Sequence, residues 1–155
     1  MMVSMLTAIG QQKSFKSSDL SRNSTQVFAA AEDEPVEVTR RDGEDLVLMS
    51  KLESDAREKL LQLAATLIGV ATDTRGTLAK RMADALPWML ALSPTDQDAC
   101  ANDLLNAARA SFSTGQAHLA VAELNSWLET ATAVAAGLGT APVEWLDEDI
   151  IVERP

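Results

Sequence analysis

The stretch that decides the fold is VEVTRRDGEDLVLM, residues 36–49. Its first four residues alternate apolar and polar side chains, which is the period of a β-strand with one buried face. Asp42-Gly43 is a dipeptide typical of tight hairpin turns. The continuous apolar run Leu46–Met49 predicts a second strand after that turn. The stretch therefore predicts a β-hairpin.

The residues before this hairpin predict a strand and a helix. Residues 13–17, KSFKS, have the length and pattern of a short strand. Ser18 is a favourable helix N-cap, and Asp19 follows it at the positive end of the helix dipole. Pro35 ends the helix. One helical face carries the apolar residues Leu20, Val27, Phe28 and Ala31. Residues 13–50 therefore predict the order β-α-β-β.

The apolar strand predicts a dimer. An apolar run without alternation indicates that both faces of the strand are covered. One short helix covers only one face, and a module of about 40 residues is too small to bury a sufficient core alone. A second copy of the module is the simplest cover, so we expect a homodimer. The alternative is that later helices of the same chain cover the second face.

The rest of the chain predicts helices. Apolar residues recur at three- and four-residue steps over residues 51–71, 77–86, 94–112 and 116–136. Ser93-Pro94 is a clear helix start, and Gly137-Leu138-Gly139 is a clear helix end. The expected fold class is α+β, with a β-α-β-β dimerisation module followed by a mostly α-helical C-terminal region.

Four segments follow from these patterns. Residues 1–12 are a leader and a candidate for disorder, 13–52 the module, 53–140 the helical region and 141–155 an acidic tail. The tail mixes five acidic residues and a single Arg154 with large apolar ones such as Trp145 and Ile150. Such a segment can fold onto a partner protein. The alternative is that Trp145 and Ile150 dock on the chain's own helices.

The charge of the chain limits the classes of partner. The net charge is −10 over 155 residues, which argues against a general nucleic-acid-coating protein. Residues 1–52 hold six basic and eight acidic side chains, net −2, whereas residues 53–155 hold seven and fifteen, net −8. A site for a polyanion is therefore expected in the first third, and the acidic remainder suits a basic protein partner.

The sequence offers no pattern typical of an enzyme. Cys100 lies in an apolar helical run, which favours a small buried residue over a nucleophile. His118 stands at an expected helix start without a nucleophile signature beside it. We find no metal-ligand spacing, no phosphate-binding glycine loop, no signal peptide and no membrane span. We therefore expect a cytoplasmic, non-enzymatic protein without a metal or cofactor.

Two stretches resemble a known family. The residues SDLSRNS, 18–24, and the residues VTRRDGE and LVLMS, 38–44 and 46–50, resemble the prevent-host-death (Phd/YefM) antitoxin family. The resemblance covers about residues 13–60. It implies an N-terminal module that dimerises and binds palindromic operator DNA, and a C-terminal region that sequesters a co-encoded toxin. Residues 60–155 do not match the short C-terminal segments of better-known members.

The candidate DNA contacts come from both stretches. Ser18 and Ser21 offer hydroxyls at a helix start, where backbone N–H groups also bind phosphate. Arg22 can pair with guanine or phosphate, and Asn23 can read adenine. The resemblance gives Arg40 a DNA contact, and Arg41 stands beside it. The alternative is that both arginines lie in a solvated turn balanced by its acidic residues.

The expected function is that of an antitoxin in a type II toxin-antitoxin system, which neutralises its toxin and represses its own operon. The toxin is expected to be basic, a ribonuclease or a nucleotide-handling protein. The candidate toxin contacts in the tail are Glu144, Trp145, Leu146, Asp147, Asp149 and Ile150. The alternative function is a helical adaptor that dimerises through its N-terminal module without binding DNA.

Overall fold

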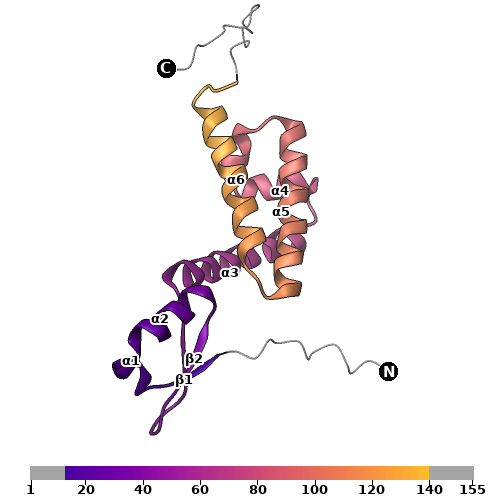
Figure 1. Cartoon of the computed structure of the whole chain (residues 1–155). Coiled ribbons are helices and arrows are strands. Elements are labelled where there is room, and N and C mark those ends of the chain that lie inside the picture. Colours follow the sequence, from indigo (N-terminus) through magenta and orange to yellow (C-terminus); the bar gives the residue numbers. More distant parts are fainter. Residues whose placement is uncertain (1–12, 140–155) are drawn as a thin grey trace, which may run out of the picture. The chain divides into compact units, whose positions relative to one another are not determined.

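The computed structural model of the chain describes residues 13–139 (Figure 1). The chain divides into two compact units between Lys59 and Leu60, inside helix α3 (Lys51–Thr72). The N-terminal unit holds all three strands, and the C-terminal unit is helical. The mixed α+β class expected from the sequence is therefore confirmed, and each unit is described by itself.

The N-terminal unit is a small sheet with two helices between its first strands. The elements are β1 (Ser14–Lys16), α1 (Asp19–Arg22), α2 (Ser24–Asp33), β2 (Val36–Thr39) and β3 (Leu46–Leu48). The strands lie in the order β1-β2-β3, with β1 parallel and β3 antiparallel to β2. The strands and the helical connection follow the predicted β-α-β-β order.

The prediction of one continuous helix after Ser18 is wrong, because Asn23 interrupts it. Asn23 has φ −133° and ψ 39°, which is not helical, and it separates α1 from α2. The Ser18 side chain makes no capping hydrogen bond. The carboxylate of Asp19 instead accepts a hydrogen bond from the Lys16 amide at 2.8 Å. The Asn23 carbonyl accepts hydrogen bonds from the Gln26 and Val27 amides, so Asn23 is the N-cap of α2, a position that asparagine favours.

The tight turn predicted at Asp42-Gly43 is also wrong. The strands pair Val36 with Leu48 and Val38 with Leu46, so the whole of residues 40–45 connects them. A two-residue turn of the Asp-Gly type needs positive φ, and Gly43 is not among the positive-φ glycines of residues 13–139. The Asp45 carboxylate accepts a hydrogen bond from the Arg40 amide at 3.0 Å and closes the longer loop.

The core of the N-terminal unit lies between α2 and one face of the sheet. Val36 and Val38 of β2 are buried, and Val27, Ala30 and Ala31 of α2 are buried as well. The alternation along the strands places Ser14, Lys16, Glu37, Thr39 and Val47 on the opposite face. Val47 is 55% exposed, so the apolar run of β3 is not covered on both faces. The open face is polar apart from this valine.

The C-terminal unit is a helical bundle. Besides the second part of α3 it contains α4 (Leu78–Ala85), the 3₁₀ helix η1 (Pro87–Ala91), α5 (Pro94–Thr114) and α6 (His118–Ala135). Helix α6 lies beside α5 (Figure 1). The Ser93 hydroxyl caps α5 by accepting from the Asp96 amide at 3.1 Å, as its sequence predicts. The predicted helices of this region are confirmed within a few residues.

The bundle core is built from small and medium apolar side chains. Met82, Met89, Cys100 and Leu104 are fully buried, which confirms the interpretation of Cys100 as a buried small residue. Within residues 13–139, the one polar side chain that is fully buried is Ser111. Its hydroxyl accepts a hydrogen bond from the Ala120 amide at 3.0 Å, which fixes the start of α6 against α5.

Two expected segments lie outside the described residues: the leader 1–12 and the tail, with the candidate toxin contacts Glu144, Trp145, Leu146, Asp147, Asp149 and Ile150. Among the helices of residues 13–139, none combines the length and the apolar character needed to cross a bilayer.

Candidate nucleic-acid interface

The parallel pairing of β1 and β2 brings the two groups of candidate DNA contacts to one edge of the sheet. Lys16 is the register partner of Thr39, and the Ser17 amide donates to the Thr39 carbonyl at 2.9 Å. The chain leaves β1 into Ser18 and α1, and it leaves β2 into Arg40 and the β2–β3 loop. Because carboxyl ends of parallel strands meet at the same edge, α1 and that loop lie at the same end of the unit (Figure 1).

All six candidate DNA contacts are exposed: Ser18, Ser21, Arg22, Asn23, Arg40 and Arg41. Within residues 13–139, none of the three arginine side chains has an ion-pair partner. The acidic residues of the loop do not hold them, although the sequence allowed this alternative. These guanidinium groups are therefore available to a ligand that carries negative charge.

Gly43 has a role that the sequence did not predict. A β-carbon added at Gly43 would lie 3.1 Å from Cζ of Arg40 and 3.2 Å from both of its terminal nitrogens. The Arg40 side chain therefore folds over the glycine, and any larger residue would push the guanidinium away. The loop therefore contacts Arg40 at two points: its guanidinium lies against Gly43, and its backbone amide donates to the Asp45 carboxylate.

The helix start is a weaker phosphate site than the sequence implied. Helix α1 has only four residues, so few aligned peptide groups contribute to its dipole. Its first residue is Asp19, whose carboxylate already accepts the Lys16 amide. Phosphate contacts at this end of the unit therefore depend on the arginine side chains more than on the helix start.

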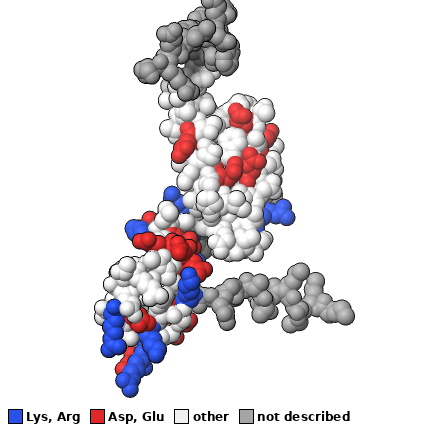
Figure 2. Space-filling view, viewed as in Figure 1, with Lys and Arg blue, Asp and Glu red and all other residues white. Residues whose placement is uncertain are grey.

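Basic side chains dominate this end of the unit, but acidic side chains lie among them. Figure 2 shows Lys and Arg side chains gathered over the α1 end and the β2–β3 loop of the N-terminal unit, with acidic side chains close by. The acidic residues of the loop are Asp42, Glu44 and Asp45. A single copy therefore offers a weak attraction for a polyanion, and two copies bound to one duplex would multiply it.

The N-terminal unit also exposes three large apolar side chains: Phe28 on α2, Leu46 on the face of β3 that α2 covers, and Val47 on the open face of the sheet. These side chains are 52%, 51% and 55% exposed, respectively. They belong to α2 and to β3, which is an edge strand of the sheet. A hollow of about 200 Å³ lies beside Phe28 and is lined by Phe28, Ala31, Glu32, Leu48, Met49 and Ser50. Exposed edge strands with apolar side chains are sites of association.

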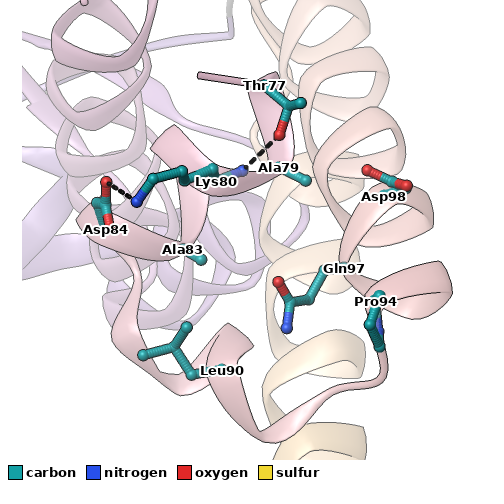
Figure 3. A pocket seen from close by; sticks show the side chains of 9 residues that line it. All are labelled: Thr77, Ala79, Lys80, Ala83, Asp84, Leu90, Pro94, Gln97 and Asp98. Carbon is teal, nitrogen blue, oxygen red and sulfur yellow. Dashed lines mark hydrogen bonds and ion pairs between the residues drawn. The ribbon is translucent and has the colours of Figure 1, made fainter. Parts of the chain in front are cut away.

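The C-terminal unit has a hollow between α4 and the start of α5 that is lined by both apolar and polar side chains (Figure 3). Its volume is about 320 Å³, and an ion pair of Lys80 with Asp84 at 3.6 Å crosses part of its rim. Asp98 lies on its opposite side (Figure 3). Within residues 13–139, no group of three or more His, Cys, Asp or Glu residues is placed to hold a metal ion.

Cys100 is held as a neutral thiol. Burial raises its pKa to about 12, and the negative charges of Asp103 and Glu123 add to the effect. The thiolate is the reactive form of cysteine, so this side chain is inert at neutral pH. His118 is the first residue of α6, as predicted, and it is exposed.

Comparisons with known proteins give no match. No family model matches the chain, and neither a curated protein nor a solved structure is significantly similar to it.

Proposed function

We propose that the chain is an antitoxin-repressor, which binds DNA as a dimer through its N-terminal unit and sequesters a basic toxin through its acidic C-terminal part. One observation supports the proposal most strongly. The parallel strands β1 and β2 deliver Arg22, Arg40 and Arg41 to one edge of the sheet, exposed and without an ion pair among residues 13–139. Such residues can contact phosphates and guanine edges of a duplex.

The dimer is supported by the exposed edge strand β3, which carries Leu46 on one face of the sheet and Val47 on the other. Phe28, Leu46 and Val47 each retain about half of their side-chain surface in water. A second copy that pairs its own β3 with this edge by two-fold symmetry would bury part of this surface. It would also double the number of arginines available to one duplex, which raises affinity without new contacts.

Neutralisation is assigned to the acidic tail. Residues 141–155 interleave five carboxylates with apolar residues such as Trp145, Leu146 and Ile150. Apolar anchors of this kind fill pockets in a partner, while carboxylates occupy positions that phosphates would take in a nucleic-acid or nucleotide site. The proposed toxin is therefore a basic protein of the ribonuclease or nucleotide-handling type, encoded beside this chain.

A gel-shift experiment tests the DNA-binding half. The full chain is titrated into a duplex from the region upstream of its coding sequence, with and without the co-encoded protein. Arg22→Ala and Arg40→Ala should each weaken the shift, whereas the control Arg109→Ala, an exposed arginine of α5, should not. If Arg22→Ala and Arg40→Ala leave DNA binding and all cellular function intact, the chain is an adaptor without a DNA role.

A deletion of residues 141–155 tests the neutralising half. The shortened chain should still bind the duplex, because the described DNA contacts all lie in the N-terminal unit. It should no longer protect cells that express the toxin. Protection by the shortened chain would place the inhibitory surface in the helices instead.

A further inference from the structure

A groove between α3 and α4 of the C-terminal unit contains the guanidinium group of Arg81, one of whose N–H groups has no hydrogen-bond partner among residues 13–139. The groove has a volume of about 360 Å³ and is lined by Ala65, Thr66, Gly69, Val70, Asp73, Arg81, Asp84 and Ala85. Arg81 donates from Nη1 to the Gly76 carbonyl at 3.2 Å. Its Nε–H is buried and has no hydrogen-bond partner among residues 13–139. A buried donor left unsatisfied is costly, so an acceptor from outside these residues is expected.

The charge around the groove is positive in a unit that is otherwise acidic. Residues 60–139 contain four basic side chains, and three of them, Arg75, Lys80 and Arg81, lie on α4 or just before it. Asp73 pairs with Arg75 at 3.0 Å, and Asp84 pairs with Lys80 at 3.6 Å. Arg81 also lowers the pKa of Asp73, so it is not isolated from these carboxylates. The three cations outnumber the two carboxylates, Asp73 and Asp84, by one positive charge, which favours a carboxylate ligand.

The outer rim of the groove is apolar. Leu61 and Ile68 are 72% and 65% exposed, and Ala65 of the groove lies between them at helical steps of four and three residues. A ligand that fits this surface carries carboxylates for Arg81 together with large apolar side chains for the rim.

The chain itself contains a segment of this chemistry. The tail follows α6 in the same unit, and it carries Trp145, Leu146 and Ile150 among five carboxylates. Residues 140–155 can extend over about 50 Å, which exceeds the roughly 27 Å length of α6, so the tail reaches any part of its unit. A tethered segment has an effective concentration near the millimolar range, so weak contacts are enough to hold it.

We propose that the acidic tail, residues 141–155, docks in the α3–α4 groove of its own unit, with its carboxylates at Arg81 and its apolar side chains over Leu61 and Ile68. The proposal goes beyond the proposed function and does not depend on it, since the tail docks whether or not a partner later displaces it. In an antitoxin, this docking would keep the toxin-binding segment covered until the toxin competes for it.

A spin label on the tail tests the proposal in the full chain. Cys100 is buried and unreactive, so a Pro155→Cys variant takes a nitroxide at the tail alone. We expect paramagnetic broadening of the amide signals of Gly69 and Arg81 at low salt, and little at Gly115 in the α5–α6 turn. The broadening should weaken at high salt, because part of the attraction is electrostatic. Equal broadening at all three amides, or none, overturns the proposal.

Substituted chains and a mixed sample test whether the tail binds this groove and whether it does so within one chain. In the spin-labelled chain, Arg81→Glu and Ile68→Ser should each reduce the selective broadening several-fold, whereas Leu119→Ser, an exposed residue of α6, should not. Ile68→Ser changes an exposed side chain, so it keeps the test valid if Arg81→Glu disturbs folding.

A mixture of spin-labelled unenriched chain with unlabelled ¹⁵N-enriched chain should show no broadening. Broadening in that mixture would mean that the tail of a second copy occupies the groove, which contradicts the proposal.

Discussion

The substitution Val47→Lys should break the proposed dimer without unfolding the chain. Val47 lies on the open face of the sheet in the edge strand β3, and it is 55% exposed. A lysine at such a position keeps its ammonium in water in the single chain, so the folding free energy should change by no more than about 0.5 kcal/mol. In a two-fold interface along the β3 edge, the same ammonium would lie near its own symmetry-related copy, and like charges repel.

The size of the effect follows from the exposed area of Val47. Complete burial of a valine side chain contributes about 1.5–3 kcal/mol, so covering the exposed half contributes about 1 kcal/mol. The symmetric interface contains this residue twice, which gives about 2 kcal/mol for the pair. A factor of ten corresponds to about 1.4 kcal/mol, so the dimer dissociation constant should rise at least about 30-fold.

Sedimentation equilibrium over a range of chain concentrations measures this change. The wild-type chain and the control Leu119→Lys, which changes a comparably exposed residue of α6, should have the same dimer dissociation constant. Thermal unfolding of the three proteins checks that the monomer remains intact. If Val47→Lys dimerises as tightly as the wild type, the β3 edge is not the interface and the reasoning from exposed area fails.

Three further predictions concern the core and the loop. Ser111→Ala should lower the free energy of unfolding by about 1–3 kcal/mol in urea titrations, because it leaves the buried Ala120 amide without a hydrogen-bond acceptor. An unchanged free energy would mean that this hydrogen bond does not fix the start of α6 against α5. The pKa of Cys100 is raised to about 12 in the folded chain, so the thiol ionises at a lower pH in the unfolded chain than in the folded one. The free energy of unfolding should therefore fall as the pH rises from the ordinary thiol pKa toward 12. Urea titrations of Cys100→Ala should show a smaller fall, and an identical fall would refute the assignment. Gly43→Ala should displace the Arg40 guanidinium and weaken DNA binding several-fold in anisotropy titrations, whereas unchanged affinity would show that the position of Arg40 does not matter.

The elements could be predicted from the sequence because their signals are local. The alternation in residues 36–39, the cap at Ser93 and the apolar steps along α3 and α6 each depend on neighbours within a few positions. The same signals failed at Asn23 and at Asp42-Gly43. At the first place Asn23 caps a second helix instead of continuing the first, and at the second the Asp45 carboxylate accepts from the Arg40 amide and closes a longer loop; residue preferences alone do not reveal either outcome.

The candidate site could be predicted only in part. Arg22 and Arg40 are exposed, as a contact with DNA requires. Their placement at the same end of the sheet depends on the parallel pairing of β1 with β2, which is a contact between residues far apart in the sequence. The contact of Gly43 with Arg40 and the unpartnered Nε of Arg81 likewise need the folded chain. The sequence carries no periodicity or spacing that would predict the groove between α3 and α4.

The salt dependence of DNA binding tests the central claim most directly. Fluorescence anisotropy of a labelled duplex from the upstream region is titrated with the full chain at several salt concentrations. Two chains should bind each duplex, and Arg40→Ala should reduce the slope of log affinity against log salt by about 1.8, since each lost phosphate contact contributes about 0.9 and the dimer loses two. Binding of one chain per duplex, or a slope that Arg40→Ala leaves unchanged, would contradict the account.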